Sequence, residues 1–259
     1  MTGALARAWW RRVRVWKTVS GVALVAMSAL LLLLATTRSV TAQAVAAVRL
    51  DAGRFTIVHY PRDARLARTV ADVATARDTF PWLPRPRARV LIMIAPDAAT
   101  FREWVGPSVP EWGAAVAFTD QSRVVLQGSA ADGSAGDPRA LLRHELAHLA
   151  LAEALGDLPP RWFHEGYAQY AAGEVDGNAY LQTNLALLFR RMPTFDGLDS
   201  AFATRSSVSA AAAYRLAALA VTHMAERDPA RGLTLLFRYW PETGRLDGAV
   251  RRAFGTTLD

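Results

Sequence analysis

The chain has 259 residues, of which 52% are hydrophobic and 20% charged, enough apolar sequence to bury a full core and too much for a disordered or fibrous protein. It contains no cysteine, so a disulfide framework and a thiolate metal site are both excluded, and any metal must be bound by histidine and carboxylate. The formal net charge is +7, but five cations lie within the first 17 residues, and residues 18–259 carry only +2. This balance predicts no nucleic-acid partner.

The amino terminus has the pattern of a membrane-targeting segment. Residues 18–37 contain no charged side chain, and as a helix rising about 1.5 Å per residue they would span roughly 30 Å, which matches a bilayer core. The five preceding cations are Arg7, Arg11, Arg12, Arg14 and Lys17. Under the positive-inside rule, we expect residues 1–37 to form a cytoplasmic basic segment and a single-pass anchor in the cell membrane, with the remainder outside the cytoplasm.

A cleaved signal peptide is the alternative interpretation of the same segment. Residues 40–42 are small enough for a cleavage site, and cleavage would give a secreted protein. Either way, we expect residues 38–50 to be a linker and residues 51–259 to form the functional domain.

The region up to residue 127 combines strands with helices. Strands are predicted where apolar and β-branched residues run together between turn residues, and helices where apolar residues recur every three or four positions. These criteria predict strands at residues 55–60, 90–95, 114–118 and 123–127, and helices at residues 62–79 and 97–104. The last two strands are expected to form a hairpin, because only residues 119–122 separate them.

From residue 128 the pattern changes to helices alone. Asp137 and Pro138 are typical start signals and Gly156 a stop signal, while Pro160 opens a second helix that ends before Gly173. Further helices are expected at residues 180–191, 208–227, 229–239 and 247–253. A small mixed β-sheet followed by a helical subdomain predicts the α+β fold class.

The first of these helices carries the sequence HELAH at residues 144–148. His144 and His148 are four residues apart and therefore lie on one helix face, where both imidazoles can bind one cation. Glu145 projects beside them and can accept a proton from a metal-bound water. This is the HExxH zinc motif, and it predicts one Zn²⁺ ion with Glu145 as the general base.

A catalytic zinc needs a third protein ligand, and the next helix offers one in the sequence PRWFHEGYAQY at residues 160–170. Here the chain resembles the gluzincin metallopeptidases, and among them the peptidase MA-like family, in which HExxH is followed by the pattern W-x-x-E-G-x-A-x-Y. The matching residues are Trp162, Glu165, Gly166, Ala168 and Tyr170. The resemblance implies a zincin-like active site with Glu165 as the third metal ligand, and a peptide or protein as the substrate.

Three neighbouring side chains have possible roles at the zinc site, two as alternative ligands and one as a residue that orients a ligand. Asp157 would be the third ligand in an aspartate-type zincin, and otherwise it shapes the turn before the second helix. His164 is also a possible ligand, but it points about 100° away from Glu165 and would then line a substrate subsite or lie at the surface. Gln169 lies one turn after Glu165 and would either orient a zinc-binding histidine or be a surface residue.

Amide hydrolysis also requires a group that stabilises the developing oxyanion. Gluzincins commonly supply a tyrosine or histidine from a later helix, and the resemblance extends to the sequence AAYRLA at residues 212–217, so Tyr214 is the candidate. Arg215 and His223 are further candidates, and a purely structural role in the core is the other interpretation of Tyr214.

The family also places an edge strand beside the zinc, where it pairs with an extended peptide. Residues 112–118 and residues 123–127 both qualify for that edge, although each would also serve as an interior strand. The sequence thus predicts a membrane-anchored or exported zinc metallopeptidase with Glu145 and Tyr214 as catalytic residues. The alternative is a catalytically inactive zinc-binding scaffold or a peptide-binding domain at the membrane surface. The presence of Glu145 argues against a purely structural site, which needs no base between its ligands.

Overall fold

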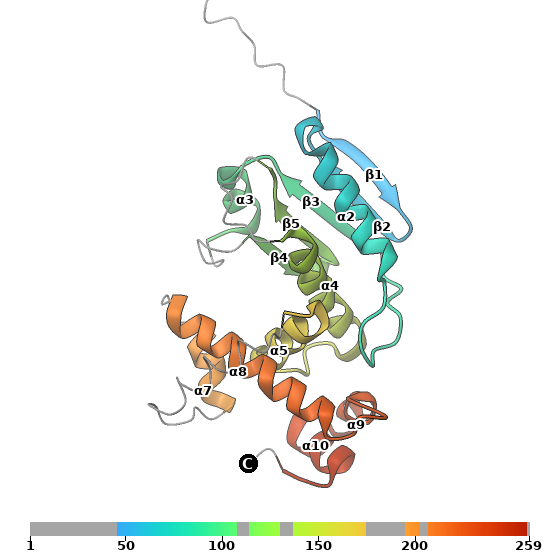
Figure 1. Ribbon diagram of the computed structural model, residues 1–259, viewed down its shortest axis with the longest axis vertical. Helices are drawn as coiled ribbons and strands as arrows, with labels where there is room; N and C mark the ends of the chain where they lie inside the picture. The colour runs from blue at the N-terminus through green and yellow to red at the C-terminus, as the bar shows by residue number, and fades with distance from the viewer. Residues whose placement is uncertain (1–45, 108–113, 130–136, 175–194, 203–206, 258–259) are drawn as a thin grey trace, which may run out of the picture. The chain divides into compact units, whose positions relative to one another are not determined.

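The computed structural model describes residues 46–107, 114–129, 137–174, 195–202 and 207–257 (Figure 1). The membrane segment predicted at residues 18–37 and the helix predicted at residues 180–191 lie outside these ranges. In the described ranges, no helix has the length and apolar character needed to cross a membrane.

Five strands form one mixed sheet in the order β1-β2-β3-β5-β4 (Figure 1). They are β1 (Val48–Ala52), β2 (Phe55–His59), β3 (Val90–Ala95), β4 (Ala115–Phe118) and β5 (Arg123–Gln127). The three central strands β2, β3 and β5 are parallel, and β1 and β4 pair antiparallel to them at the two edges. The predicted hairpin is present, with Ala115 opposite Leu126. The α+β class is therefore confirmed as a five-stranded mixed sheet with helices.

The edge strand β1 was not predicted. It begins at Val48, inside the stretch that the sequence suggested as a linker, and pairs with β2 so that Val48 lies opposite His59. It is five residues long, and its side chains are exposed or only partly buried, so it shows little hydrophobic patterning. Pairing with β2 stabilises it, and that contact is not visible in a short window of sequence.

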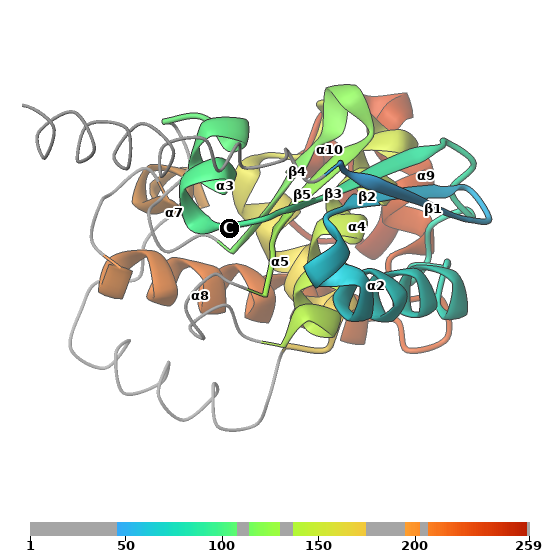
Figure 2. The ribbon, with the colours of Figure 1, turned by 90° about the horizontal axis from the view of Figure 1, so that it is seen from above.

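Helices cover both faces of the sheet (Figure 2). Helix α2 (Ala64–Ala76) and helix α4 (Pro138–Leu155) pack on one face, where Ile92 of β3 and Val124 of β5 are fully buried. Helix α3 (Ala98–Val105) packs on the other face against Val125. Because alternate strand residues point to opposite faces, neighbouring Val124 and Val125 belong to different hydrophobic clusters.

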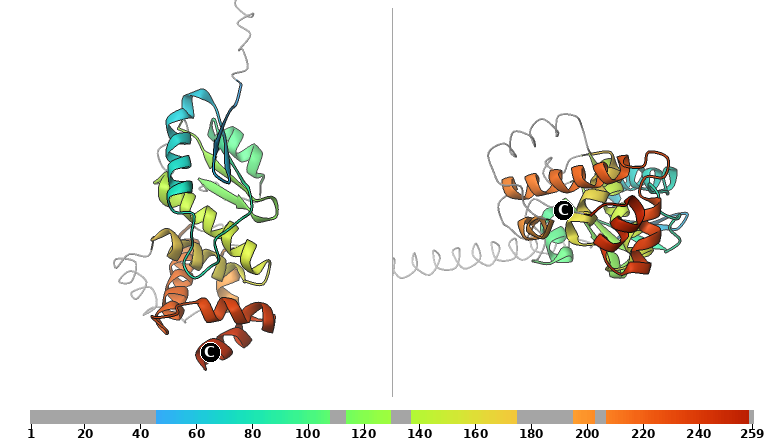
Figure 3. Two further views of the ribbon diagram at one scale, coloured as in Figure 1. Left: turned by 90° about the vertical axis from the view of Figure 1, so that its right-hand side faces the viewer. Right: turned by 90° about the horizontal axis from the view of Figure 1, so that it is seen from below.

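The helices that follow gather at one end of the sheet (Figure 3). They are α5 (Arg161–Ala172), α7 (Phe195–Phe202), α8 (Ser207–Glu226), α9 (Thr234–Thr243) and α10 (Leu246–Phe254). Helix α5 packs against both α4 and α8. Its buried Phe163 and Tyr167 meet Phe237 and Trp240 of α9 edge to face, so aromatic packing holds α5 in a fixed position.

Helices α3 and α4 begin with an aspartate cap. Asp97 accepts a hydrogen bond from the Thr100 amide, Asp137 accepts one from the Arg139 amide, and α4 ends at Gly156. The helix predicted from residue 229 instead begins at Thr234, because Asp228 accepts the amides of Ala230 and Arg231 and holds them in a turn.

Candidate metal centre

Helix α4 presents His144 and His148 on one face, with their ring centroids 4.9 Å apart. The opposite side of the helix is anchored in the core by Leu142, Leu146 and Leu149. Both histidine side chains are only 12–13% exposed. The sequence thus fixes the two rings as neighbours, and burial of the leucines fixes the direction in which they point.

Glu165 of α5 completes a cluster of three possible metal ligands. Its Oε2 lies 3.5 Å from Nε2 of His144 and 3.5 Å from Nε2 of His148. One ligand atom from each of the three residues lies within 4.8 Å of the others. Tetrahedral zinc binds nitrogen and oxygen at about 2.0–2.2 Å, which separates two ligand atoms by roughly 3.3–3.5 Å. The donor set and its spacing therefore fit one zinc ion.

The charges of the cluster are strongly coupled in the metal-free protein. Burial opposes the imidazolium form of His144, but hydrogen bonds to Glu165 and Glu174 outweigh burial and raise the pKa of His144 to about 10. Burial would also raise the pKa of Glu165, but its hydrogen bonds to His144 and His148 hold that pKa well below the usual range. A proton on His144 therefore competes with a metal ion for this cluster at neutral pH.

Glu145 lies beside the cluster and is 7% exposed. Burial raises the pKa of its carboxyl group, whereas the neighbouring His144 and His148 lower it. The backbone amide of Ala117 in β4 hydrogen-bonds the same carboxylate. Two segments were suggested for the substrate edge. In the first, residues 112–118, positions 112 and 113 lie outside the described residues, and residues 115–118 form the edge strand β4. The second, residues 123–127, forms β5, which lies between β3 and β4. The Glu145 carboxylate is therefore next to the sheet edge.

Tyr214 of α8 lies close enough to the cluster to interact with it. Burial raises the pKa of its hydroxyl most, and the negative charges of Glu165 and Glu145 raise it further. The Arg161 guanidinium lowers this pKa through its charge and a hydrogen bond. The Tyr214 ring packs edge to face on Phe202 of α7, with centroids 4.9 Å apart. The other two candidates, Arg215 and His223, are exposed.

A glycine makes this approach of α8 possible. A β-carbon at Gly166 would lie 2.3 Å from the carbonyl oxygen of Ala217 and 2.9 Å from Cγ2 of Val221. The glycine that follows Glu165 in the sequence pattern therefore lets the backbone of α8 contact α5. This contact places Tyr214 next to Glu165.

Two charged residues of the centre were missed by sequence reasoning. Oε2 of Glu174 lies 3.3 Å from Nδ1 of His144, and Nε of Arg161 lies 3.8 Å from Oε1 of Glu165. Arg161 is four residues before Glu165 on the same helix, so i,i+4 spacing was the available signal. For Glu174 the signal was Gly173, a typical helix stop that reverses the chain.

The alternative ligands lie outside the cluster. Within the described ranges, the group of possible metal ligands contains neither Asp157 nor His164. The ring of His164 lies 5.9 Å from that of His148, and burial, together with the nearby His148, lowers the pKa of His164 to about 4. The backbone carbonyl of Gln169 accepts a hydrogen bond at the end of α5. The side chain that contacts Nδ1 of His144 is that of Glu174 and not that of Gln169.

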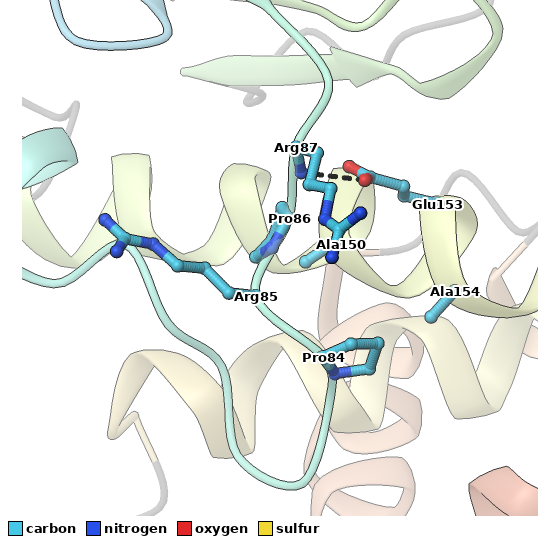
Figure 4. Close-up of a pocket in the computed structure, with 7 residues that line it drawn as sticks. All are labelled: Pro84, Arg85, Pro86, Arg87, Ala150, Glu153 and Ala154. Carbon is cyan, nitrogen blue, oxygen red and sulfur yellow. Dashed lines mark hydrogen bonds between the residues drawn. The ribbon is translucent and has the colours of Figure 1, made fainter.

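A cavity of about 390 Å³ lies beside α4 without including the three clustered residues (Figure 4). Its lining residues are Pro84, Arg85, Pro86, Arg87, Ala150, Glu153 and Ala154. Glu153 accepts hydrogen bonds from the amides of Arg87 and Ala88, at 2.8 Å and 3.3 Å. These two hydrogen bonds connect the segment before β3 to α4.

Comparison with protein families identifies a superfamily that this chain matches. The model of the peptidase MA superfamily matches residues 87–259, which include the helices α4 and α5 and the cluster that they carry. Comparison with curated proteins finds no match. The match covers well over half of the chain, so this protein belongs to the peptidase MA superfamily.

Proposed function

We propose that this protein is a zinc metallopeptidase of the gluzincin type, in which His144, His148 and Glu165 hold one ion. The observation that carries the proposal is the convergence of two imidazole Nε2 atoms on one oxygen of Glu165, each at 3.5 Å. A buried carboxylate, Glu145, lies beside them. When bound, Zn²⁺ acidifies a water molecule and polarises the substrate carbonyl.

Glu145 takes the proton of the attacking water and later delivers it to the leaving amine. A carboxylate with this task needs a pKa closer to neutral than that of an exposed glutamate, and burial raises the pKa of Glu145 in that direction. The Ala117 amide holds the carboxylate in place. These features support Glu145 as the general base and acid.

Tyr214 donates a hydrogen bond to the oxyanion that develops during attack. Burial and the charges of Glu165 and Glu145 raise the pKa of its hydroxyl, which keeps it protonated and able to donate at neutral pH. Arg161 holds the hydroxyl through a hydrogen bond.

The substrate backbone binds along β4. The Gln127 amide donates to the carbonyl of Ala114, and in an antiparallel ladder the residues that face the partner strand alternate. Ala115 and Ala117 therefore direct their polar backbone groups away from β5, and the Ala117 amide reaches Glu145. An extended peptide that pairs with this edge would pass beside the proton acceptor.

The experiment that tests the function compares Glu145→Gln and His148→Ala with the wild-type chain. We expect wild type to bind one zinc and to cleave peptides from a library, with loss of cleavage when a chelator is added. Glu145→Gln should keep the zinc and lose turnover by at least about 10²-fold, because it removes only the proton acceptor. His148→Ala should lose both zinc and activity. Full activity in Glu145→Gln would refute the assigned base, and zinc binding without cleavage by wild type would instead favour an inactive scaffold or peptide-binding domain.

We also propose that the peptidase acts outside the cytoplasm, held at the cell membrane by residues 18–37 or released after signal cleavage. The support is the uncharged stretch of 20 residues preceded by five cations.

A further inference from the structure

We infer that Glu174 is a positioning residue of the metal centre, whose carboxylate fixes the tautomer and the ring orientation of His144. This inference rests on the proposed metal-dependent function. It concerns a residue outside both the HExxH motif and the pattern that follows it.

The two ring nitrogens of His144 face two different carboxylates. Nε2 lies 3.5 Å from Oε2 of Glu165, and Nδ1 lies 3.3 Å from Oε2 of Glu174. A histidine that binds a metal through Nε2 carries its proton on Nδ1, and a carboxylate that accepts this proton holds the ring in place and makes Nε2 more basic. Within the described part of the chain, such an acidic neighbour at Nδ1 is found for His144 and not for His148.

The backbone directs Glu174 toward α4. Helix α5 ends at Gly173, which has the left-handed conformation φ 75°, ψ 26°. The Gly173 amide donates to the carbonyl of Tyr170, and the Glu174 amide donates to that of Gln169. These two bonds are the Schellman motif, in which the chain reverses directly after the helix. The reversal returns the Glu174 side chain to the histidine face of α4.

A second contact fixes the same end of α5 to α4. Nε of Arg143, the residue before His144, donates to the carbonyl of Ala171 at 3.2 Å. The guanidinium also donates to the carbonyls of Arg77 and Thr79 and lies over the Phe80 ring. The end of α5 thus has a defined place beside His144. Helix α5 supplies the proposed metal ligand Glu165, and the residue after its glycine cap, Glu174, supplies the carboxylate that orients His144 on α4.

The simpler interpretation is a surface ion pair with no effect on the metal, since the Glu174 side chain is 32% exposed. The two interpretations differ in what removal of the carboxylate does. Loss of an exposed ion pair leaves metal affinity unchanged, whereas loss of a carboxylate that orients a ligand weakens metal binding by about 10- to 100-fold.

The test measures Zn²⁺ affinity of the metal-free full chain by competition with a chromophoric chelator, in wild type, Glu174→Gln, Glu174→Ala and Glu103→Ala. Glu103 is an exposed glutamate of α3 and serves as the matched control. We expect affinity to fall about 10- to 100-fold in Glu174→Ala. The fall should be smaller in Glu174→Gln, whose amide oxygen still accepts the Nδ1 proton, and Glu103→Ala should match wild type.

Two further readouts separate positioning from folding. The visible absorption spectrum of the Co²⁺-substituted protein should change in Glu174→Ala, because the ligand field depends on the orientation of His144. The metal-free variant should stay folded with a slightly lower thermal midpoint, because Glu174 accepts a hydrogen bond from the His144 imidazolium. Wild-type affinity in Glu174→Ala, or an affinity loss with the wild-type Co²⁺ spectrum, would overturn the inference. Failure of wild type itself to bind zinc would instead overturn the proposed function.

Discussion

Glu145 is buried and the Glu165 side chain is 13% exposed, and the pKa values of these two neighbouring carboxylates shift in opposite directions. Burial raises the pKa of Glu145, whereas hydrogen bonds from the two histidines overcome burial and lower that of Glu165. A carboxylate that stays ionised suits a metal ligand, and one with a raised pKa suits proton transfer. The two environments thus support the different tasks that we propose for these two glutamates.

The raised pKa of His144 predicts how zinc affinity depends on pH. The pKa of His144 is raised to about 10 in the metal-free protein, and the imidazole must lose this proton to bind through Nε2. We expect zinc binding at pH 7–8 to release about one proton, and the affinity to rise about tenfold per pH unit in this range. Calorimetric titration in two buffers with different ionisation enthalpies measures the proton count.

The raised pKa of His144 also determines how the folding stability of the metal-free protein changes with pH. Because folding raises the pKa of His144, its imidazolium stabilises the metal-free protein below about pH 6.5, and this contribution disappears as the pH rises toward 10.

Zinc binding with no proton release would contradict the charge assigned to His144. His223→Ala, at an exposed histidine, should release the same number of protons as wild type.

At the scale of elements, α5 is the helix whose placement decides the site. Its first turn lacks a side-chain cap of its own at Pro160, and the carboxylate of Asp199 in α7 accepts the Trp162 amide at 2.7 Å instead. Its middle contacts the backbone of α8 at Gly166, and its last turn returns Glu174 to α4. Three separate elements therefore fix the position of Glu165, the third ligand in the proposed metal site.

The contact of α5 with α8 predicts a large effect of Gly166→Ala. The added β-carbon would lie 2.3 Å from the Ala217 carbonyl oxygen, a backbone atom that cannot move without α8. We expect a loss of about 1–3 kcal/mol in the free energy of unfolding and a fall in turnover, as Tyr214 moves away from Glu165. Denaturant titration and peptide-cleavage assays measure these effects.

Gly248→Ala provides the control for this substitution. A β-carbon at Gly248 in α10 would have its nearest neighbour at 3.2 Å, in the side chain of Thr243. Alanine is also the better helix former, so the free energy of unfolding should stay close to wild type or increase. An equally small effect of both substitutions would show that α5 and α8 do not need the glycine.

At the scale of the whole molecule, the positive charge of the sequence belongs mainly to its amino terminus. Five cations precede the uncharged residues 18–37, and the remaining 242 residues have a formal charge of only +2. The pattern is the one that the positive-inside rule predicts for a membrane-targeting segment, and it supports the localisation proposed above.

The asymmetry predicts that the full chain fractionates with membranes. We expect it to stay in the membrane pellet after carbonate extraction and to be accessible to protease from the outside of the cell. Deletion of residues 18–37 should release the domain into the soluble fraction. A full chain that is found in the cytoplasmic soluble fraction would contradict both the anchor and the signal-peptide interpretation.

The sequence alone determined the features that depend on neighbours within one or two turns. Helix α4 runs between Asp137 and Gly156 because capping and helix-stop chemistry are local, and the two histidines share a face because helical periodicity puts residues four apart together. The residue pattern at positions 160–170 likewise predicted, through a family resemblance, that Glu165 joins the two histidines.

Tertiary structure alone decided which distant segments meet at the centre. Glu174 reaches α4 through a chain reversal, and Asp199 caps α5 from another helix. Tyr214 was predicted only by the family resemblance, and the close contact of α8 with α5 brings it to Glu165. The order of the strands, with β4 at the edge and β1 paired to β2, was settled in the same way. These contacts join residues far apart in the chain, and they form only when the burial of apolar faces brings whole elements together, a condition that no short stretch of sequence expresses.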